Sequence, residues 1–303
     1  MENAMAFDLT DLARKVRAAG RAMGTEGFAT MELYRPFHET EPYTSLKLER
    51  DISYGPDERN RLDVFSSPNA SAKDKRDVLI FVHGGGFVQG DKHTPGSPYN
   101  DNVPLWAMRN GLVGVNMTYR LAPQHKWPSG IEDIAGAVDW TRRNIAARGG
   151  NPERIFVFGV SAGAMHAGMY VSHSRLVGGP PIAGAILESG IYDFSREATG
   201  IEPNERQAQY MGTMDNAILA QRASIDGLVN AKIPVLYVIC EYDPPMFEAA
   251  LSLLMNRYLK QHGAWPNIVR LMGHNHFTGT IALNTPDDYL GRQILSFIEN
   301  SRS

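Results

Sequence analysis

The sequence has little cysteine, no long apolar run and no surplus of positive charge. Among its 303 residues Cys240 is the only cysteine, so no disulfide can form within the chain. Cys240 ends an apolar run, 234–239, which favours burial of the thiol over reactivity. No apolar stretch approaches the roughly 18 residues that a membrane-spanning helix needs. These absences exclude a fold that depends on internal disulfides and a fold built from membrane-spanning helices.

The charges of the chain nearly balance. Thirty Lys and Arg residues face 33 Asp and Glu residues, for a formal net charge of −3, and the sequence pI is about 6.3. The densest charged run, 73–77, mixes both signs and is typical of a solvated loop. A nucleic-acid partner is therefore not expected. Residues 1–5 lack the basic-then-apolar pattern of a signal peptide, so we expect a cytoplasmic, soluble protein with no membrane partner. The sequence leaves the oligomeric state open, with a homodimer as one alternative.

What the chain does have is an alternation of apolar runs and helical patterns. Two β-like runs, 46–52 and 62–65, flank Gly55-Pro56-Asp57 and predict a hairpin. Six further apolar runs are typical of buried strands: 78–82, 112–117, 155–158, 183–187, 235–240 and 268–272. Helical patterns occupy 131–147, 162–174, 247–262 and 289–298. Strands alternating with helices predict an α/β fold, with a mostly parallel sheet covered by helices on both faces.

Two segments stand outside this alternation. Residues 5–23 carry apolar side chains at helical spacing, and Gly24 and Gly27 are expected to end that helix. Residues 191–230 interrupt the strand-helix rhythm with few strand signals. We expect a single domain over 1–303, in which 1–43 and 191–230 form a small helical cap over the site.

The strongest local signal for chemistry is Gly159-Val160-Ser161-Ala162-Gly163. It follows the predicted strand 155–158 and precedes the predicted helix 162–174. This G-x-S-x-G pattern between a strand and a helix is typical of a nucleophile elbow. The glycines leave room for a strained turn, and the hydroxyl of Ser161 then lies at a helix N-terminus, where negative charge is stabilised. The alternative is an ordinary strand-helix turn made of small residues.

A second glycine-rich segment, His83-Gly84-Gly85-Gly86-Phe87, follows the predicted strand 78–82. Adjacent glycines suit a loop whose backbone N–H groups must approach a ligand atom. The order of residues is not that of a phosphate-binding loop, which needs G-x-G-x-x-G or a Gly-Lys-Ser/Thr ending. We therefore predict an oxyanion hole made by the N–H groups of Gly85, Gly86 and Ala162. His83 is expected to stabilise the loop rather than to catalyse.

A nucleophilic serine needs a base, and the base needs an acid that orients it. After the strand 235–240 come Glu241 and Asp243, and after the strand 268–272 come His274 and His276. We predict Asp243 and His276, with Glu241 as the alternative acid and His274 as the alternative base. His262 is a poorer candidate because it ends a helix just before a glycine.

The same histidines raise the alternative of a metal site. His-x-His spacing is compatible with one, but the sequence shows no third or fourth ligand. A metal would also leave both glycine motifs unexplained. No metal and no cofactor are expected.

Three motifs in this order resemble a known family. The segments 83–87, 119–123 (Tyr-Arg-Leu-Ala-Pro) and 159–163 are together similar to the hormone-sensitive-lipase-like branch of the α/β-hydrolase esterases. The resemblance covers roughly residues 60–300. It implies an α/β-hydrolase fold, a Ser-Asp-His order of catalytic residues, and structural roles for Arg120 and Asp133.

The chain also departs from that branch. Val160 stands where the branch usually has Asp, and the run 274–277 (His-Asn-His-Phe) replaces a single His followed by Gly-Phe. The segments 189–193 and 241–243, with the pair His276-Phe277, look more like arylformamidase-type relatives, which cleave small acyl groups from aromatic amines.

These signals predict a serine hydrolase that cleaves small carboxylic esters. An arylformamidase, or another amide or carbamate hydrolase with the same triad, is the first alternative. A non-catalytic receptor for a small ligand on the same fold is the second. The predicted substrate-binding side chains are Phe87, Tyr192, Met246 and Phe247, and for each one core packing is the competing interpretation. Trp106, Phe194 and Met211 are further candidates on the same terms.

Overall fold

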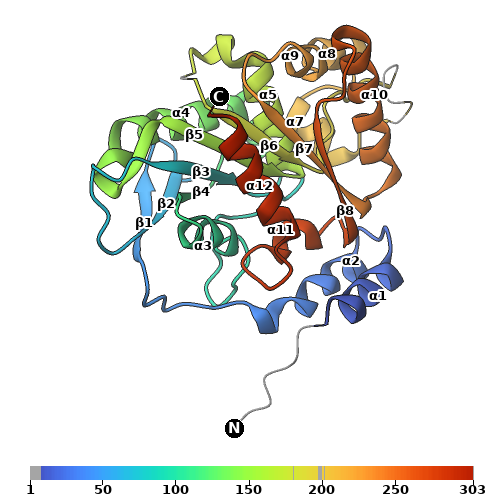
Figure 1. The fold of residues 1–303 in the computed structure, drawn as a ribbon. Helices are drawn as coiled ribbons and strands as arrows, with labels where there is room; N and C mark the ends of the chain where they lie inside the picture. Colours follow the sequence, from blue (N-terminus) through green and yellow to red (C-terminus); the bar gives the residue numbers. More distant parts are fainter. Residues whose placement is uncertain (1–7, 180, 197–199, 201, 303) are drawn as a thin grey trace.

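An eight-stranded sheet forms the centre of the computed structural model, which describes residues 8–179, 181–196, 200 and 202–302 (Figure 1). The order of the strands in the sheet is β1-β2-β4-β3-β5-β6-β7-β8. Their bounds are β1 (Lys47–Ser53), β2 (Arg61–Ser66), β3 (Arg76–Val82), β4 (Val113–Met117), β5 (Gly150–Val160), β6 (Gly184–Glu188), β7 (Val235–Tyr242) and β8 (Asn267–Asn275).

The sheet is antiparallel at one edge and parallel elsewhere. β1 pairs with β2, and β2 with β4, in antiparallel register. The strands from β4 through β3, β5, β6 and β7 to β8 are all parallel neighbours. Strands such as β3 are apolar along nearly their whole length because both of their faces are covered. The predicted hairpin and the predicted mostly parallel sheet are both confirmed.

Helices cover the two faces of the sheet. One hydrophobic core lies under α4 (Ser129–Asn144), α5 (Ala162–Val177) and α10 (Pro245–His262). A second core lies on the other face, under α3 (Asn102–Arg109) and α12 (Tyr289–Asn300). The predicted layers are therefore confirmed, although the sequence pattern did not predict α3.

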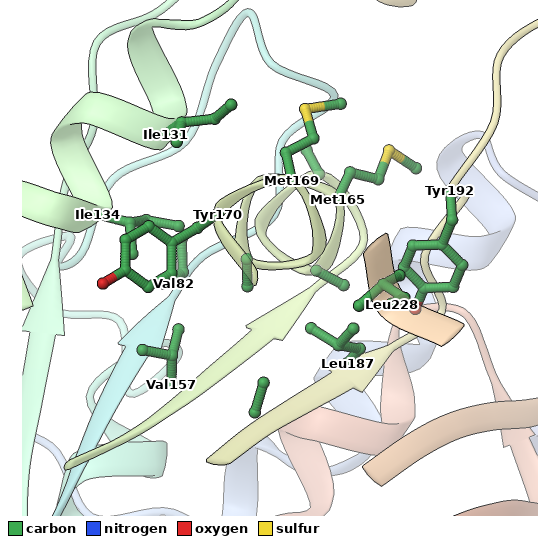
Figure 2. Packing of buried hydrophobic residues seen from close by; sticks show 14 of the residues in the cluster. Val82, Ile131, Ile134, Val157, Met165, Met169, Tyr170, Leu187, Tyr192 and Leu228 are labelled. Carbon is green, nitrogen blue, oxygen red and sulfur yellow. The ribbon is translucent and has the colours of Figure 1, made fainter. Parts of the chain in front are cut away.

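Figure 2 shows how α5 is seated on the sheet. Val82, Val157 and Leu187 rise from three neighbouring strands toward the helix. Tyr170 lies toward α4, while Leu228 of the 191–230 segment lies on the opposite side of α5. The first part of the helix, Ala162–Tyr170, is buried and fixed by this packing, and its N-terminus begins directly after Ser161.

The segment 191–230 carries short helices joined by irregular stretches where the structure describes it. It contains α7 (Glu205–Met211), α8 (Asn216–Gln221) and α9 (Ile225–Val229). α7 begins with a capping box, in which Asn204 and Gln207 satisfy each other's backbone N–H groups.

The N-terminal segment lies beside the end of β8 (Figure 1). It contains α1 (Leu9–Ala19), α2 (Thr25–Ala29) and two 3₁₀ turns, η1 (Thr30–Leu33) and η2 (Arg35–Phe37). The helix expected over 5–23 is shorter than predicted, and residues 5–7 lie outside the described part of the chain. Gly27 does not break a helix but lies inside α2. The remaining short helices are η3 (Ile145–Arg148) and α11 (Thr278–Ala282). Within the described ranges, no helix has the length and apolarity that crossing a membrane requires.

Candidate active site

The predicted site residues follow four strands at the same edge of the sheet. The glycine-rich loop follows β3, Ser161 follows β5, Asp243 follows β7, and His276 follows β8. These strands are parallel, so their carboxyl ends share one edge. Ligands of α/β sheets bind outside this edge.

The turn at Ser161 is strained, as the motif predicts. Ser161 has φ 53° and ψ −120°, a backbone conformation that residues other than glycine seldom adopt. A Cβ atom on Gly159 would lie 2.3 Å from the carbonyl oxygen of Gly163, and one on Gly163 would lie 2.1 Å from that of Val82. Only glycine fits at these two positions. The N–H of Ser161 donates to the carbonyl of Glu188 at 2.9 Å, which holds the turn against β6.

Ser161, His276 and Asp243 form one chain of hydrogen bonds. Nε2 of His276 lies 3.0 Å from Oγ of Ser161, and Nδ1 of the same ring lies 2.7 Å from Oδ1 of Asp243. Asp243 and His276 are buried, whereas Ser161 is half-buried and accessible. A serine, a base and an orienting acid at these distances can deprotonate the hydroxyl as it attacks.

The acid is itself held in place by its neighbours. Oδ2 of Asp243 accepts hydrogen bonds from Oγ of Ser189 at 2.6 Å and from the N–H of Cys240 at 2.8 Å. Arg21, just after α1, donates to the carbonyl of Asp243 and pairs with Glu248 at 2.9 Å. The orientation of the carboxylate is therefore fixed by β6, β7 and the N-terminal segment together.

The alternative acid and bases are engaged elsewhere. Nε2 of His274 lies 3.4 Å from Asp287, and burial lowers the pKa of this histidine. Glu241 accepts the N–H of Gly273 at 2.7 Å, a bond that lowers the pKa of its carboxyl. His262 contacts the carbonyl of Val229 at 2.8 Å. None of the three has a hydrogen bond to Ser161 among the described residues.

The glycine-rich loop lies against the serine. A Cβ atom on Gly84 would be 3.4 Å from Cβ of Ser161. Gly85 has φ 125°, and a Cβ there would lie 1.9 Å from the carbonyl oxygen of Gln89. In the described structure the N–H groups of Gly85, Gly86 and Ala162 donate to no other group of the chain. Free donors beside a nucleophile are what an oxyanion needs.

His83 stabilises this loop through a contact with its backbone. Its Nδ1 lies 2.6 Å from the carbonyl oxygen of Gly84, and its ring stacks on Tyr119 with centroids 4.3 Å apart. Complete burial lowers the pKa of His83 to about 4, so the ring is neutral at neutral pH. It has no contact with Ser161 among the hydrogen bonds described, in keeping with the expected structural role.

A very small pocket, of about 10 Å³, lies between the segment 191–230 and the start of α10. Its lining residues are Ile191, Asp193, Phe194, Glu202, Pro203, Gln207 and Met246. Met246 is thus a pocket residue.

The other predicted substrate-binding side chains lie elsewhere. Phe87 stacks on Tyr210 in the core, with centroids 4.5 Å apart and rings nearly parallel at 3°. Tyr192 is 2% exposed. Phe247 packs on the ring of His276, with centroids 4.4 Å apart. Of the further candidates, Phe194 lines the pocket, Met211 is buried and Trp106 lies in the core of the opposite face.

Sequence reasoning missed three residues beside this machinery. Glu188 ends β6, and Ser189, which donates to Asp243, directly follows it at the edge where the other site residues lie. This position after a predicted strand is the signal that could have found them. Burial raises the pKa of Glu188 to about 7. The third is Arg206 of α7, whose side chain crosses Gly86. Only the packing of α7 reveals it.

Metal ligands are not grouped in the described chain. Residues 8–179, 181–196, 200 and 202–302 contain no cluster of three or more His, Cys, Asp or Glu side chains able to hold a metal ion. The site as described consists of a serine, a histidine, a carboxylate and free backbone donors.

Curated proteins with similar sequences are named as esterases. The esterase LipQ of Mycobacterium tuberculosis is 29% identical over 227 residues, which cover 71% of this chain and 53% of the relative. The carboxylesterase NlhH of the same species is 37% identical over 117 residues, 38% of this chain and 35% of the relative. The chain thus spans about half or less of the length of these relatives.

Solved structures share the fold. A crystal structure of inhibited esterase B from Lactobacillus rhamnosis aligns with a TM-score of 0.72 at 15% identity, covering 96% of this chain and 97% of that one. At such low identity the likeness establishes the fold alone.

The family itself follows from the sequence profile. A profile of the family described as alpha/beta hydrolase fold matches residues 79–249, more than half of the chain. The matched range holds the glycine-rich loop, Ser161 and Asp243. The sheet, the strained serine turn and this match agree, and the chain belongs to the α/β-hydrolase fold family.

Proposed function

We propose that this protein is a carboxylesterase that cleaves small carboxylic esters through Ser161, His276 and Asp243. The observation that carries the proposal is the continuous chain of hydrogen bonds from Ser161 through His276 to Asp243, beside free N–H donors. The esterase names of the curated relatives and of the structural neighbours support it.

In the proposed first half of the reaction, Oγ of Ser161 attacks the ester carbonyl carbon while Nε2 of His276 takes the hydroxyl proton. Asp243 accepts a hydrogen bond from Nδ1 and stabilises the imidazolium that forms. The carbonyl oxygen becomes an oxyanion, and the N–H groups of Gly85, Gly86 and Ala162 donate to it. The C–O bond to the alcohol then breaks, and the proton on His276 passes to the leaving oxygen.

In the second half, water replaces the alcohol. His276 removes a proton from water, the hydroxide attacks the acyl-serine, and the carboxylic acid leaves as Ser161 regains its proton. Because Asp243 is buried and doubly hydrogen-bonded, it keeps the ring in the same orientation through both halves.

The experiment is hydrolysis of p-nitrophenyl acetate, butyrate and decanoate by the wild type and by Ser161→Ala, with fluorophosphonate labelling in parallel. We expect the substitution to lower kcat by at least about a thousandfold and to abolish labelling. The side chain of Ser161 is half-buried and makes its described hydrogen bond only to His276, so the variant should keep its thermal stability.

Two results would point elsewhere. Labelling of Ser161 without ester turnover, but with cleavage of an N-formylated arylamine, would identify an amide-type hydrolase. Undiminished ester turnover by Ser161→Ala would refute the proposed nucleophile. The cytoplasmic location and the absence of nucleic-acid and membrane partners stay predictions from the sequence.

A further inference from the structure

A cationic side chain crosses the loop that supplies the proposed oxyanion hole. A Cβ atom on Gly86 would lie 3.0 Å from Cδ and 3.3 Å from Nη1 of Arg206. Arg206 is exposed, so its guanidinium lies where the loop meets solvent. A positive charge therefore lies next to the loop that carries the N–H of Gly86.

The helix that carries Arg206 is fixed to the same loop. Tyr210, one helical turn along α7, stacks on Phe87, which directly follows Gly86. The carbonyl of Tyr210 accepts the N–H of Trp127 at 2.8 Å, and its hydroxyl accepts that of Gly130 at 3.3 Å. The position of the arginine over Gly86 is therefore set by buried contacts and not only by its own flexible side chain.

The acids around α7 already have hydrogen-bonding partners. Glu202 pairs with Arg196 at 2.9 Å. Asp193 accepts both the N–H and the hydroxyl of Ser195 at 2.8 and 2.7 Å, and Glu205 accepts from Gln209 at 3.2 Å. In the part of the chain that the structure describes, the guanidinium of Arg206 makes no ion pair and no hydrogen bond.

We propose that Arg206 binds a carboxylate on the substrate, so that the preferred substrates are small esters that also carry a negative charge, such as half esters of dicarboxylic acids. This inference rests on the proposed esterase function. An arginine fork matches a carboxylate geometrically, and a charge-assisted hydrogen bond is stronger than a neutral one.

The test compares charged and neutral esters of matched shape. Monoethyl glutarate and ethyl pentanoate place the charge on the acyl side, and 4-acetoxybenzoate and 4-methylphenyl acetate place it on the alcohol side. Release of acid is followed for the wild type, Arg206→Ala, Arg206→Lys and Arg175→Ala. Arg175 is an exposed arginine at the end of α5 remote from Ser161, so its loss removes one positive charge away from the site.

We expect Arg206→Ala to lower kcat/KM about ten- to a hundredfold for a charged ester and less than about twofold for its neutral partner. Arg206→Lys should retain an intermediate value, since it keeps the charge and loses the fork. Arg175→Ala should match the wild type on all four esters. The advantage of the charged ester should also shrink at high salt.

An equal loss of kcat/KM on charged and neutral esters in Arg206→Ala would overturn the inference. It would mean that Arg206 supports the glycine-rich loop or stabilises the oxyanion of any ester. Unchanged kinetics on both pairs would overturn it as well. A wild type that cleaves none of the four esters and resists fluorophosphonate would instead mean that the proposed function has failed. The two failures are therefore distinguishable.

Discussion

Glu188 joins the serine turn to the histidine loop. Its backbone carbonyl accepts the N–H of Ser161, while its carboxyl accepts from Oγ1 of Thr280 at 2.6 Å on α11, just after His276. The carboxyl has no exposed surface, and a Cβ on Gly279 would lie 2.2 Å from its Oε1. Burial, assisted by the nearby charge of Asp243, raises its pKa to about 7.

This raised pKa gives a pH dependence of stability with a definite sign. Below about pH 4.5 the carboxyl is protonated in both states, so it contributes no difference. Between about 4.5 and 7 the unfolded chain releases the proton and the folded chain keeps it, so the free energy of unfolding falls as pH rises. Over this range the free energy of unfolding of the wild type should fall by up to about 3 kcal/mol because of Glu188, and that fall should be missing in Glu188→Gln. Urea unfolding from pH 4.5 to 8 measures it.

The control is Glu299→Gln, which alters an exposed carboxyl on α12. Its unfolding curve against pH should run parallel to that of the wild type. A Glu188→Gln curve that also ran parallel would mean that the buried carboxyl titrates normally in the folded state.

At the scale of elements, the N-terminal segment packs against the loop that carries the proposed base. Phe28 of α2 packs on Phe277, with ring centroids 4.3 Å apart, and Phe277 directly follows His276. A Cβ on Gly27 would lie 2.1 Å from the carbonyl oxygen of Ala22 and 2.6 Å from Cε2 of Phe277. α2 therefore needs glycine at this position in order to approach the histidine loop.

We expect Gly27→Ala to displace α2 or Phe277 and to destabilise the protein by about 1–3 kcal/mol. A displaced Phe277 should also lower kcat on p-nitrophenyl butyrate, because the ring borders His276 at 5.5 Å between centroids. The measurements are the midpoint of urea unfolding and the steady-state kinetics of the same preparation.

Gly24→Ala is the matched control, since no atom lies within 4 Å of a Cβ at that position. Gly24 caps the same helix, so this variant should change stability by less than about 1 kcal/mol and leave kcat unaltered. A Gly27→Ala protein that behaved like Gly24→Ala would show that α2 is not tightly seated against Phe277.

Periodicity predicted the elements whose burial pattern is regular. The sequence predicted β3 to β8 as well as α4, α5, α10 and α12. A strand covered on both faces is a short continuous apolar run, whereas a helix with one buried face shows apolar residues at helical spacing. α3 could not, since five successive side chains from Val103 to Ala107 are buried and Pro104 lies within it. A helix buried all round has no polar face to reveal its period.

The site was predictable to the extent that its residues follow strands in the sequence. Ser161, Asp243 and His276 each come directly after a strand, so the carboxyl edge of a parallel sheet brings them together. The seat of α2 on Phe277 and the position of Arg206 over Gly86 join segments far apart in sequence. Such contacts depend on tertiary packing, which no local pattern records.

At the scale of the whole molecule, two buried histidines and Glu188 change the free energy of unfolding in opposite directions as the pH falls. The ring of His166 on α5 has no exposed surface, and neither ring nitrogen has a hydrogen-bond partner among the described residues. It is enclosed by Phe87, Tyr119 and Tyr210, with centroids 5.0, 4.5 and 4.8 Å away. Burial lowers its pKa to about 3, and that of His83 to about 4.

A neutral buried histidine makes the protein less stable in acid. Above about pH 6.5 the ring is uncharged in both states, so it contributes no difference. As pH falls below that value the unfolded chain gains a proton that the folded chain cannot take, and the free energy of unfolding declines. The decline from His83 and His166 together exceeds the opposite gain from Glu188, so we expect a net loss of stability between pH 6.5 and 4.5.

His166→Leu tests this balance, because leucine has a similar volume and cannot take a proton. Whatever its stability at pH 7, the free energy of unfolding of the variant should fall by about 2 kcal/mol less than that of the wild type when the pH is lowered from 7 to 5. Urea unfolding at half-unit steps of pH measures the difference, and the half-buried His125, replaced in His125→Leu, provides the control. Wild-type and His166→Leu curves with the same slope would mean that the folded protein protonates this ring, and the aromatic enclosure around it would then have to open in mild acid.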